Sequence, residues 1–265
     1  MGVLGLHQAA AAAYLGAALL AAAGLGLRSR RGLRGAGALL VLGAALHGVA
    51  FWRLHSLDPP PTLTQLSFAL SLMAWLGTVF YLLLQLRVRS GGLAVMVAPA
   101  AFLGAVLGAL AAPSGPSQLA RASPLWSHLH VLLASGGLAL LGLAGGAGVL
   151  YLVHHAALKS KRRGAPSSVL PSLENLDQLG AVALAAGFLL LTLGLLTGMI
   201  WLHAAEGRLW SADAHANAAL LVWVAYAGVA VARFGVHLGA RPLALASALG
   251  FLVLLLAGIG AEVWV

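Results

Sequence analysis

The chain alternates between long apolar stretches and short polar breaks. Eight stretches consist almost entirely of hydrophobic residues and glycine, and they cover residues 6–27, 37–54, 65–86, 93–112, 126–153, 180–204, 216–233 and 243–264. About 20 mostly apolar residues suffice for an α-helix to cross the hydrocarbon core of a bilayer. The breaks contain Pro, Gly, Ser and charged residues, which favour turns outside that core. The pattern predicts an all-α, polytopic membrane bundle of eight transmembrane helices, with residues 1–265 as a single integral membrane domain.

Composition narrows the class of protein further. Hydrophobic residues make up 61% of the chain and charged residues only 8%, whereas soluble domains carry about 25% charged residues. An ordinary soluble enzyme and a disordered chain are both excluded. The chain has no Cys, which excludes disulfides, thiolate metal sites and CxxC redox pairs. It also has no P-loop, GxSxG or HExxH motif, so we do not expect it to be an enzyme on its own.

The cations are distributed unevenly between the breaks. Twelve of the 15 Lys and Arg residues lie in alternate breaks, and the three others are Arg53, Arg121 and Arg208. By the positive-inside rule, loops 28–36, 87–92, 154–179 and 234–242 are cytoplasmic, and both termini lie outside a bacterial-type inner (plasma) membrane. The net charge of +9 then reflects topology and contact with anionic lipid, and we expect no nucleic acid partner.

The ten histidines show the opposite asymmetry. His47 lies inside the second stretch, and six others lie at or near the predicted outer ends: His7, His55, His128, His130, His203 and His215. Neutral imidazole is a common ligand of haem iron, although any single histidine at a helix end is also a usual interfacial residue. The sixth and seventh stretches are joined by about ten residues, so they are expected to be antiparallel neighbours. His203 and His215 are therefore near one another, and the sequence leaves open whether His130 joins them.

The same outer break is rich in aromatic residues. It carries Trp201 and Trp210 with Arg208 and Asp213, and Trp223 follows in the next stretch. Such rings either anchor helix ends at the membrane interface or form a surface for a flat macrocycle whose propionates meet Arg208. The glycines of the fifth stretch offer a similar pair of interpretations, of which close helix packing is favoured over a cofactor-binding face.

Four segments of the chain are distinctive: the LPSLENLD lead-in at 170–177, the GFLLLTLGLLTG helix at 187–198, the histidine-bearing segment 126–159, and the seventh stretch with Trp223, Tyr226 and Arg233. Together they resemble the CcsA/ResC/HemX-type (YpjD-like) family of cytochrome c assembly membrane proteins. The resemblance covers about residues 65–264 and is closest from residue 126 onward. It implies a haem-handling membrane protein of cytochrome c biogenesis that presents haem on the outer side.

The resemblance also implies a set of site residues. It makes His130 an axial ligand of haem b, and it makes His47 the counterpart of an early membrane histidine. The positions that match the family's tryptophan-rich loop are Trp201, Gly207, Trp210, Ser211 and Asp213. Other tryptophans of that loop are replaced by Glu206, Ala212 and Ala218, and a later external histidine has no counterpart. We therefore expect His203 or His215 to supply the second axial ligand, and Trp223 and Arg208 to contact the macrocycle.

Partners follow from the same resemblance. Attachment of haem would need apocytochrome c and a ResB-like membrane protein, within the lipid bilayer, and this chain would be one subunit of the haem-attachment system. The alternative is a HemX-like non-catalytic membrane regulator or assembly factor linked to tetrapyrrole synthesis, which would use loop 159–163 as its contact surface. The altered tryptophan-rich loop suits that alternative.

Overall fold

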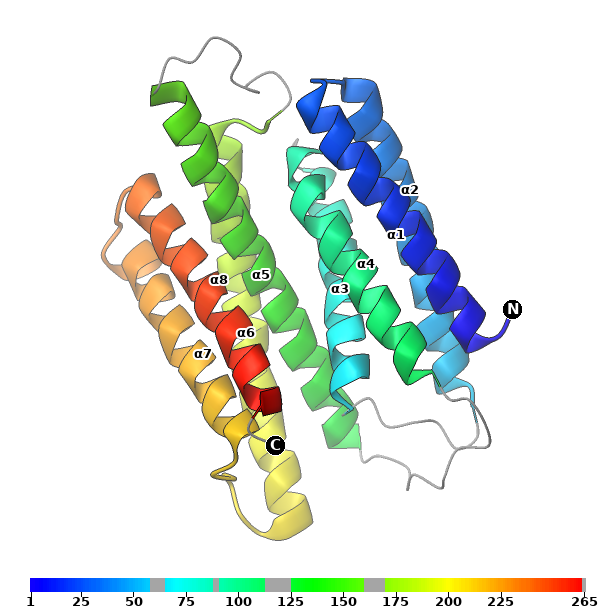
Figure 1. Ribbon diagram of the computed structural model, residues 1–265. Helices are drawn as coiled ribbons and strands as arrows, with labels where there is room; N and C mark the ends of the chain where they lie inside the picture. Colours follow the sequence, from blue (N-terminus) through cyan, green and yellow to red (C-terminus); the bar gives the residue numbers. More distant parts are fainter. Residues whose placement is uncertain (58–64, 88–90, 113–124, 160–169, 264–265) are drawn as a thin grey trace. The chain divides into compact units, whose positions relative to one another are not determined.

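The computed structural model describes residues 1–57, 65–87, 91–112, 125–159 and 170–263, with side chains up to residue 257, and this part of the chain contains helices but no strands (Figure 1). The helices are α1 (Val3–Gly26), α2 (Arg30–His55), α3 (Leu66–Gln85), η1 (Gly91–Leu93), α4 (Ala94–Ala111), α5 (Leu125–Lys159), α6 (Leu173–Glu206), α7 (Ala214–Ala230), η2 (Val231–Gly235) and α8 (Ala240–Val263). Eight spans among them are long and apolar enough to cross a membrane. The predicted helical membrane protein with about eight spans is confirmed.

The helices form two compact units, one with α1–α4 and one with α5–α8. In the first unit α1 packs against α2 and α4, and α3 packs against α4. In the second unit α5 packs against α6 and α8, while α7 packs against α8 and α6. The single-domain organisation stays a prediction.

Several helices begin or end outside the predicted apolar stretches. The side chain of Ser29 accepts a hydrogen bond from the backbone N–H of Gly32 at 3.2 Å, so α2 begins at Arg30 instead of residue 37. Ser172 caps α6 in the same way through the N–H of Asn175 at 3.1 Å, and α6 begins seven residues before residue 180. A serine that satisfies a free N–H at a helix start stabilises that start. Predicted loops 28–36 and 154–179 are therefore wrong in extent, since both are partly helical.

The glycines of α5 allow its backbone to approach α6 closely. A β-carbon at Gly137 would lie 2.5 Å from the backbone nitrogen of Leu191, and one at Gly194 would lie 2.9 Å from that of Ala134. Real β-carbons do not approach that closely, so these positions admit only glycine without a shift of the helices. The packing interpretation of the glycines agrees with these contacts, which leave no room for a flat cofactor there.

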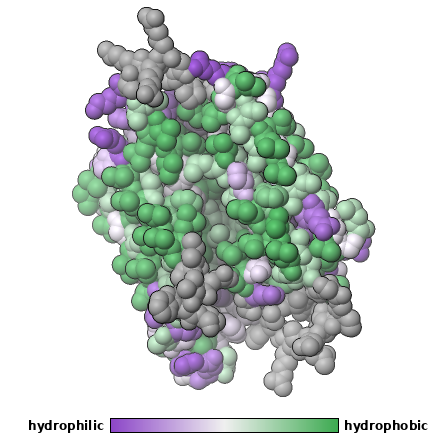
Figure 2. Space-filling view, viewed as in Figure 1, coloured by the Kyte–Doolittle hydropathy of each residue, from purple (hydrophilic) through white to green (hydrophobic). Residues whose placement is uncertain are grey.

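The exposed surface of the helices is apolar. Figure 2 shows mostly hydrophobic side chains over the middle of the helices, with hydrophilic ones gathered toward the ends. Large side chains such as Leu19, Leu103, Leu189 and Leu256 are each about 60% exposed. A soluble protein rarely exposes contiguous apolar surface on this scale, whereas lipid covers it. The chain is a multi-pass membrane protein.

Candidate functional site

His130 lies near the start of α5, where its ring contacts the backbone of α6. Its Nδ1 lies 2.8 Å from the carbonyl oxygen of Gly194. A carbonyl oxygen only accepts hydrogen bonds, so Nδ1 carries the proton and Nε2 keeps its lone pair. Imidazoles that ligate metals are commonly held in this way, with the second ring nitrogen donating to a carbonyl. The contact therefore leaves the lone pair of His130 Nε2 available to a metal ion.

One face of α6 provides the surroundings of the His130 ring. Gly194, Gly198 and Trp201 are spaced four and three residues apart, which places them on the same side of a helix. A β-carbon at Gly198 would lie 2.7 Å from His130 Nδ1, so glycine is needed for the ring to reach Gly194. The ring of Trp201 stacks on His130, with centroids 6.4 Å apart and planes at 23°.

The two predicted second ligands lie on either side of the loop between α6 and α7. His215 lies in the first turn of α7. His203 is exposed near the end of α6, and its carbonyl oxygen accepts the helix-ending hydrogen bond from Gly207 N–H at 2.9 Å. The packing of α5 against α6, which the sequence left open, joins His130 to Gly194 and Trp201.

The loop between α6 and α7 is organised by its own polar residues. Gly207 ends α6 with φ at +71°, a left-handed conformation that favours glycine. Asp213 caps α7 by accepting a hydrogen bond from the backbone N–H of Ala216 at 2.7 Å. That N–H, then the Ser211 hydroxyl, and then His215 and Arg208 lower the pKa of Asp213. Asp213 therefore fixes the start of the helix that carries His215.

Two of the remaining predicted contacts of the macrocycle, Arg208 and Trp223, have partners within the chain. Arg208 pairs with Glu206 at 2.5 Å, and the two side chains are 58% and 47% exposed. Trp223 donates from its indole N–H to the hydroxyl of Thr192 at 3.0 Å. Trp210 lies in the loop and is partly exposed. Only Trp201 of the three tryptophans stacks directly on His130 among the described residues.

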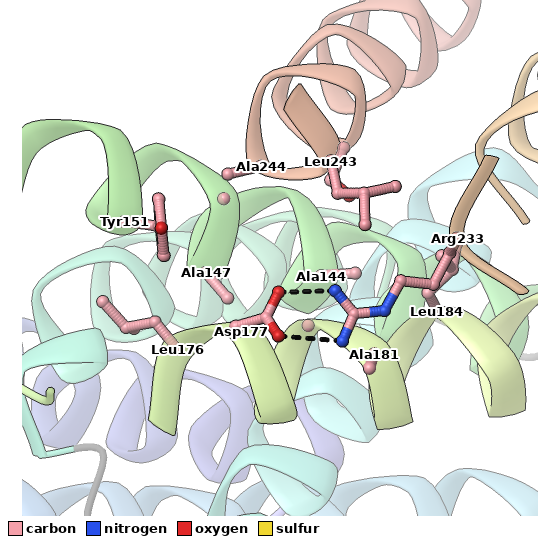
Figure 3. A pocket seen from close by; sticks show the side chains of 13 residues that line it. Ala144, Ala147, Tyr151, Leu176, Asp177, Ala181, Leu184, Arg233, Leu243 and Ala244 are labelled. Carbon is pink, nitrogen blue, oxygen red and sulfur yellow. Dashed lines mark hydrogen bonds and ion pairs between the residues drawn. The ribbon is translucent and has the colours of Figure 1, made fainter. Parts of the chain in front are cut away.

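A second polar site occupies the opposite end of the α5–α6 pair. Arg233 of η2 donates two hydrogen bonds to Asp177 of α6, at 2.5 and 2.8 Å (Figure 3). The pair borders a small pocket of about 20 Å³ between α5, α6 and α8, lined largely by small apolar side chains together with Tyr151 and Ser247. Asp177 and Arg233 both lie in segments that resemble the family, and the sequence did not predict that they meet. The contact ties the π-helical turn η2 to the start of α6.

His47 lies on α2, in the other unit. It is fully buried beside His7 of α1, with ring centroids 5.2 Å apart. The sequence placed His7 near a helix end, where an exposed position is usual, but its side chain is also completely buried. The hydropathy pattern did not predict the burial of His7, because α1 is rich in alanine on every side.

Comparison with known proteins identifies the family. The family model described as cytochrome C assembly protein matches residues 63–265. The chain belongs to this family. The predicted family and the predicted role in cytochrome c biogenesis are confirmed.

The relatives agree with that assignment. The cytochrome c biogenesis protein CcsA of Chlamydomonas reinhardtii is 31% identical over 202 residues, which is 72% of this chain and 55% of the relative. CcsA of Prochlorococcus marinus strain MIT 9313 is 29% identical over 224 residues, 72% of this chain and 70% of the relative. CcsA of Pyropia yezoensis is 25% identical over 240 residues. The chain thus spans about half of the algal protein from Chlamydomonas. The HemX-like alternative gains no support from these relatives.

Proposed function

We propose that the chain binds haem b where α5, α6 and α7 meet, and presents it to apocytochrome c on the outer side of the inner membrane. The observation that carries the proposal is the His130 ring. Its Nδ1 is tied to Gly194, its Nε2 keeps a free lone pair, and Trp201 stacks against it. This is the state that haem iron requires of an imidazole ligand.

The residues around His130 suit the other parts of haem, namely its second axial position, its macrocycle and its propionates. We include His215 as the second axial ligand, because it lies in the first turn of α7, a short loop after the end of α6 that carries Trp201. Trp201 and Trp210 supply aromatic surface for the macrocycle. The Arg208–Glu206 pair is about half exposed, and exposed ion pairs contribute only about 0–1 kcal/mol. A haem propionate can therefore replace Glu206 as the partner of Arg208 at a small cost in free energy.

The chain acts as a holder of haem within a larger assembly. Thioether bonds to haem form from cysteine thiols, and this chain has no cysteine, so the thiols belong to the apocytochrome. The role of His130 and His215 is to keep the iron ligated and the ring oriented until that protein arrives. We include a ResB-like membrane protein as the partner that completes the attachment system.

The sidedness of the site rests on the distribution of cations. The His130 end of α5 is opposite to the end that carries Lys159, and the Asp177–Arg233 pair lies at the Lys159 end with the predicted cytoplasmic loops. The positive-inside rule then places His130, Trp201 and His215 outside.

The experiment that tests the proposal is a difference spectrum of the full chain. The protein is purified in detergent after expression with added haem precursor, and reduced-minus-oxidised spectra are recorded. We expect a b-type spectrum that His130→Ala weakens at least tenfold and that added imidazole partly restores. His237→Asn is the matched control, because His237 is exposed and its φ of +55° suits Asn. No Soret band, or a band indifferent to His130→Ala, would contradict the proposal.

A second pair of variants tests the other axial ligand. His215→Ala is expected to convert a six-coordinate low-spin iron to a five-coordinate or water-ligated one, visible by electron paramagnetic resonance. His203→Ala, at the exposed end of α6, is expected to leave the signal unchanged. The reverse result would transfer the second ligand to His203.

A further inference from the structure

The carbonyl oxygen of Gly194 has contacts with two side chains that can donate to it. His130 Nδ1 lies 2.8 Å from this oxygen. The hydroxyl of Thr197, three residues further along α6, donates to the same oxygen at 2.9 Å. The haem site proposed above assigns no role to Thr197. The two donors nevertheless meet at the one atom that holds the His130 ring.

The second contact of Thr197 is additional to the usual one. A threonine inside a helix commonly donates to the carbonyl oxygen four residues before it, as Thr192 of the same helix does to Phe188 at 2.8 Å. The Thr197 hydroxyl lies 2.9 Å from the oxygen of Leu193, four residues before, and also 2.9 Å from that of Gly194. A hydroxyl has one proton, so it is divided between the two oxygens.

The Gly194 oxygen has little capacity to accept two further bonds at full strength. A carbonyl oxygen has two lone pairs, and in an α-helix it also accepts the N–H of the residue four positions later. When the Thr197 hydroxyl turns toward this oxygen, less electron density remains for the N–H of His130. The hydroxyl therefore weakens the hydrogen bond from His130 Nδ1.

Other contacts keep the His130 ring in place when Thr197 is changed. A β-carbon at Gly198 would lie 2.7 Å from His130 Nδ1, so the ring lies directly against the backbone of α6. Trp201 stacks on the ring, with centroids 6.4 Å apart. Neither contact involves the Thr197 side chain. Loss of its hydroxyl is therefore expected to change the strength of the bond to Gly194, and not the partner of His130.

The strength of that bond affects how well His130 donates electrons to a metal. A hydrogen bond from the second ring nitrogen to a carbonyl oxygen raises the basicity of a ligating imidazole. A more basic axial ligand stabilises ferric over ferrous haem, and hydrogen bonds to the ligands are one means by which proteins set the reduction potential. On the basis of the haem site at His130, we propose that Thr197 is a positioning residue. By sharing the Gly194 oxygen it weakens the bond from His130 and raises the reduction potential of the haem.

The first test needs no haem. The full chain, with isotope-labelled histidine, is studied by nuclear magnetic resonance in detergent, and the Nδ1 proton of His130 is identified by its loss in His130→Ala. Thr197→Val removes the hydroxyl and keeps the shape of the side chain, so this proton should move downfield as its bond strengthens. Thr197→Ser keeps a hydroxyl and should restore the original position. Thr78→Val, on α3 of the first unit, is the control and should leave the signal unchanged.

The second test is a potentiometric titration of the haem-loaded chain. The midpoint potential should be lower in Thr197→Val than in the unaltered chain, and it should return in Thr197→Ser. Thr197→Ala also removes the hydroxyl, and alanine favours helix, so it should agree with Thr197→Val and replaces that variant if it does not fold.

Three results would overturn the proposal: an unmoved Nδ1 proton, a potential that is unchanged or raised, or a Thr197→Ser variant that behaves like Thr197→Val. Absence of haem from the unaltered chain would contradict the proposed function instead. The proton signal would then still decide whether Thr197 controls the bond between His130 and Gly194.

Discussion

At the scale of single residues, the His130 ring depends on two glycines of α6. Gly194 provides the carbonyl oxygen that accepts from Nδ1, and Gly198 provides the gap through which the ring reaches it. The tautomer of His130 is set by that contact, and with it the availability of Nε2. Substituting a glycine that does not itself ligate haem is therefore expected to alter ligation.

Gly198→Ala tests this dependence. The added methyl group would lie 2.7 Å from His130 Nδ1, so the ring must turn away from Gly194. We expect haem content to fall severalfold, while the detergent-solubilised protein remains monodisperse by size-exclusion chromatography. Gly228→Ala is the matched control, because nothing lies within 4 Å of a β-carbon there. Equal haem content in the two variants would show that the Gly194 contact does not hold the ring.

Asp213 provides a second test at this scale, because its role as a helix cap can be separated from contact with haem. Asp213→Ala should destabilise the start of α7 by about 1 kcal/mol and weaken haem binding through His215. Asp213→Ser keeps a capping oxygen without the charge, so it should restore most of both properties. Thermal unfolding and haem content are the measurements. Loss of haem in Asp213→Ser with normal unfolding would instead assign the carboxylate to haem itself.

The same cap has a pH dependence of known sign. The pKa of Asp213 is lowered in the folded protein, from an unfolded value of 3.8, chiefly by the Ala216 N–H. Its contribution to stability is therefore complete above that unfolded value, and it is lost as the pH falls through the lower, folded pKa. Asp213→Asn should remove this part of the acid dependence from thermal unfolding measured between pH 5 and pH 2.

At the scale of elements, the Asp177–Arg233 pair joins α6 to the π-helical turn η2. The pair is bidentate and its side chains are only 28% and 21% exposed. Removing one partner leaves the other charge partly buried, which is more costly than losing an exposed pair. The contact is thus expected to hold the end of the α7–η2 segment against α6, beside the pocket in Figure 3.

Substitution of Asp177 and Arg233, singly and together, measures what the pair contributes to the free energy of unfolding. Asp177→Asn and Arg233→Gln should each lower the free energy of unfolding by about 2 kcal/mol, as observed by thermal unfolding in detergent. The double variant should lose less than the sum of the two, because neither charge is then left alone. Glu206→Gln, in the exposed pair with Arg208, is the comparison and should change stability by less than about 1 kcal/mol. Additive losses would show that Asp177 and Arg233 stabilise the fold separately.

At the scale of the whole molecule, orientation in the membrane is the property that most affects function. Cysteine labelling suits this chain, since it has no cysteine of its own. Leu209 lies in the loop between α6 and α7, beside the proposed haem site, and is 55% exposed, so an impermeant maleimide should label Leu209→Cys in intact spheroplasts. Gly239→Cys, where a β-carbon meets nothing within 4 Å, should be labelled only after permeabilisation. The opposite pattern would invert the predicted topology and place the His130 site in the cytoplasm.

The number of helices and their approximate extents could be predicted because each span is a long apolar run, and such a run has few stable conformations in lipid other than a helix. The boundaries were less accurate. Arg30, Arg31 and Arg34 look like a loop by charge, yet they belong to α2 because Ser29 caps the helix before them. For the candidate site, the sequence named His130 and Trp201, which the structure brings together, whereas the contact of Asp177 with Arg233 and the burial of His7 were not predicted.

The sequence by itself determined the apolar spans, the asymmetry of the cations and the motifs of the family, because each depends on residues that are near one another along the chain. Only the tertiary structure decided which histidine meets which helix. His130 reaches Gly194, Arg233 reaches Asp177, and His7 lies against His47, over separations of 64, 56 and 40 residues. These pairs depend on the rotation of each helix and on the glycines that let backbones approach. The hydropathy pattern predicts neither the rotation nor the close approach.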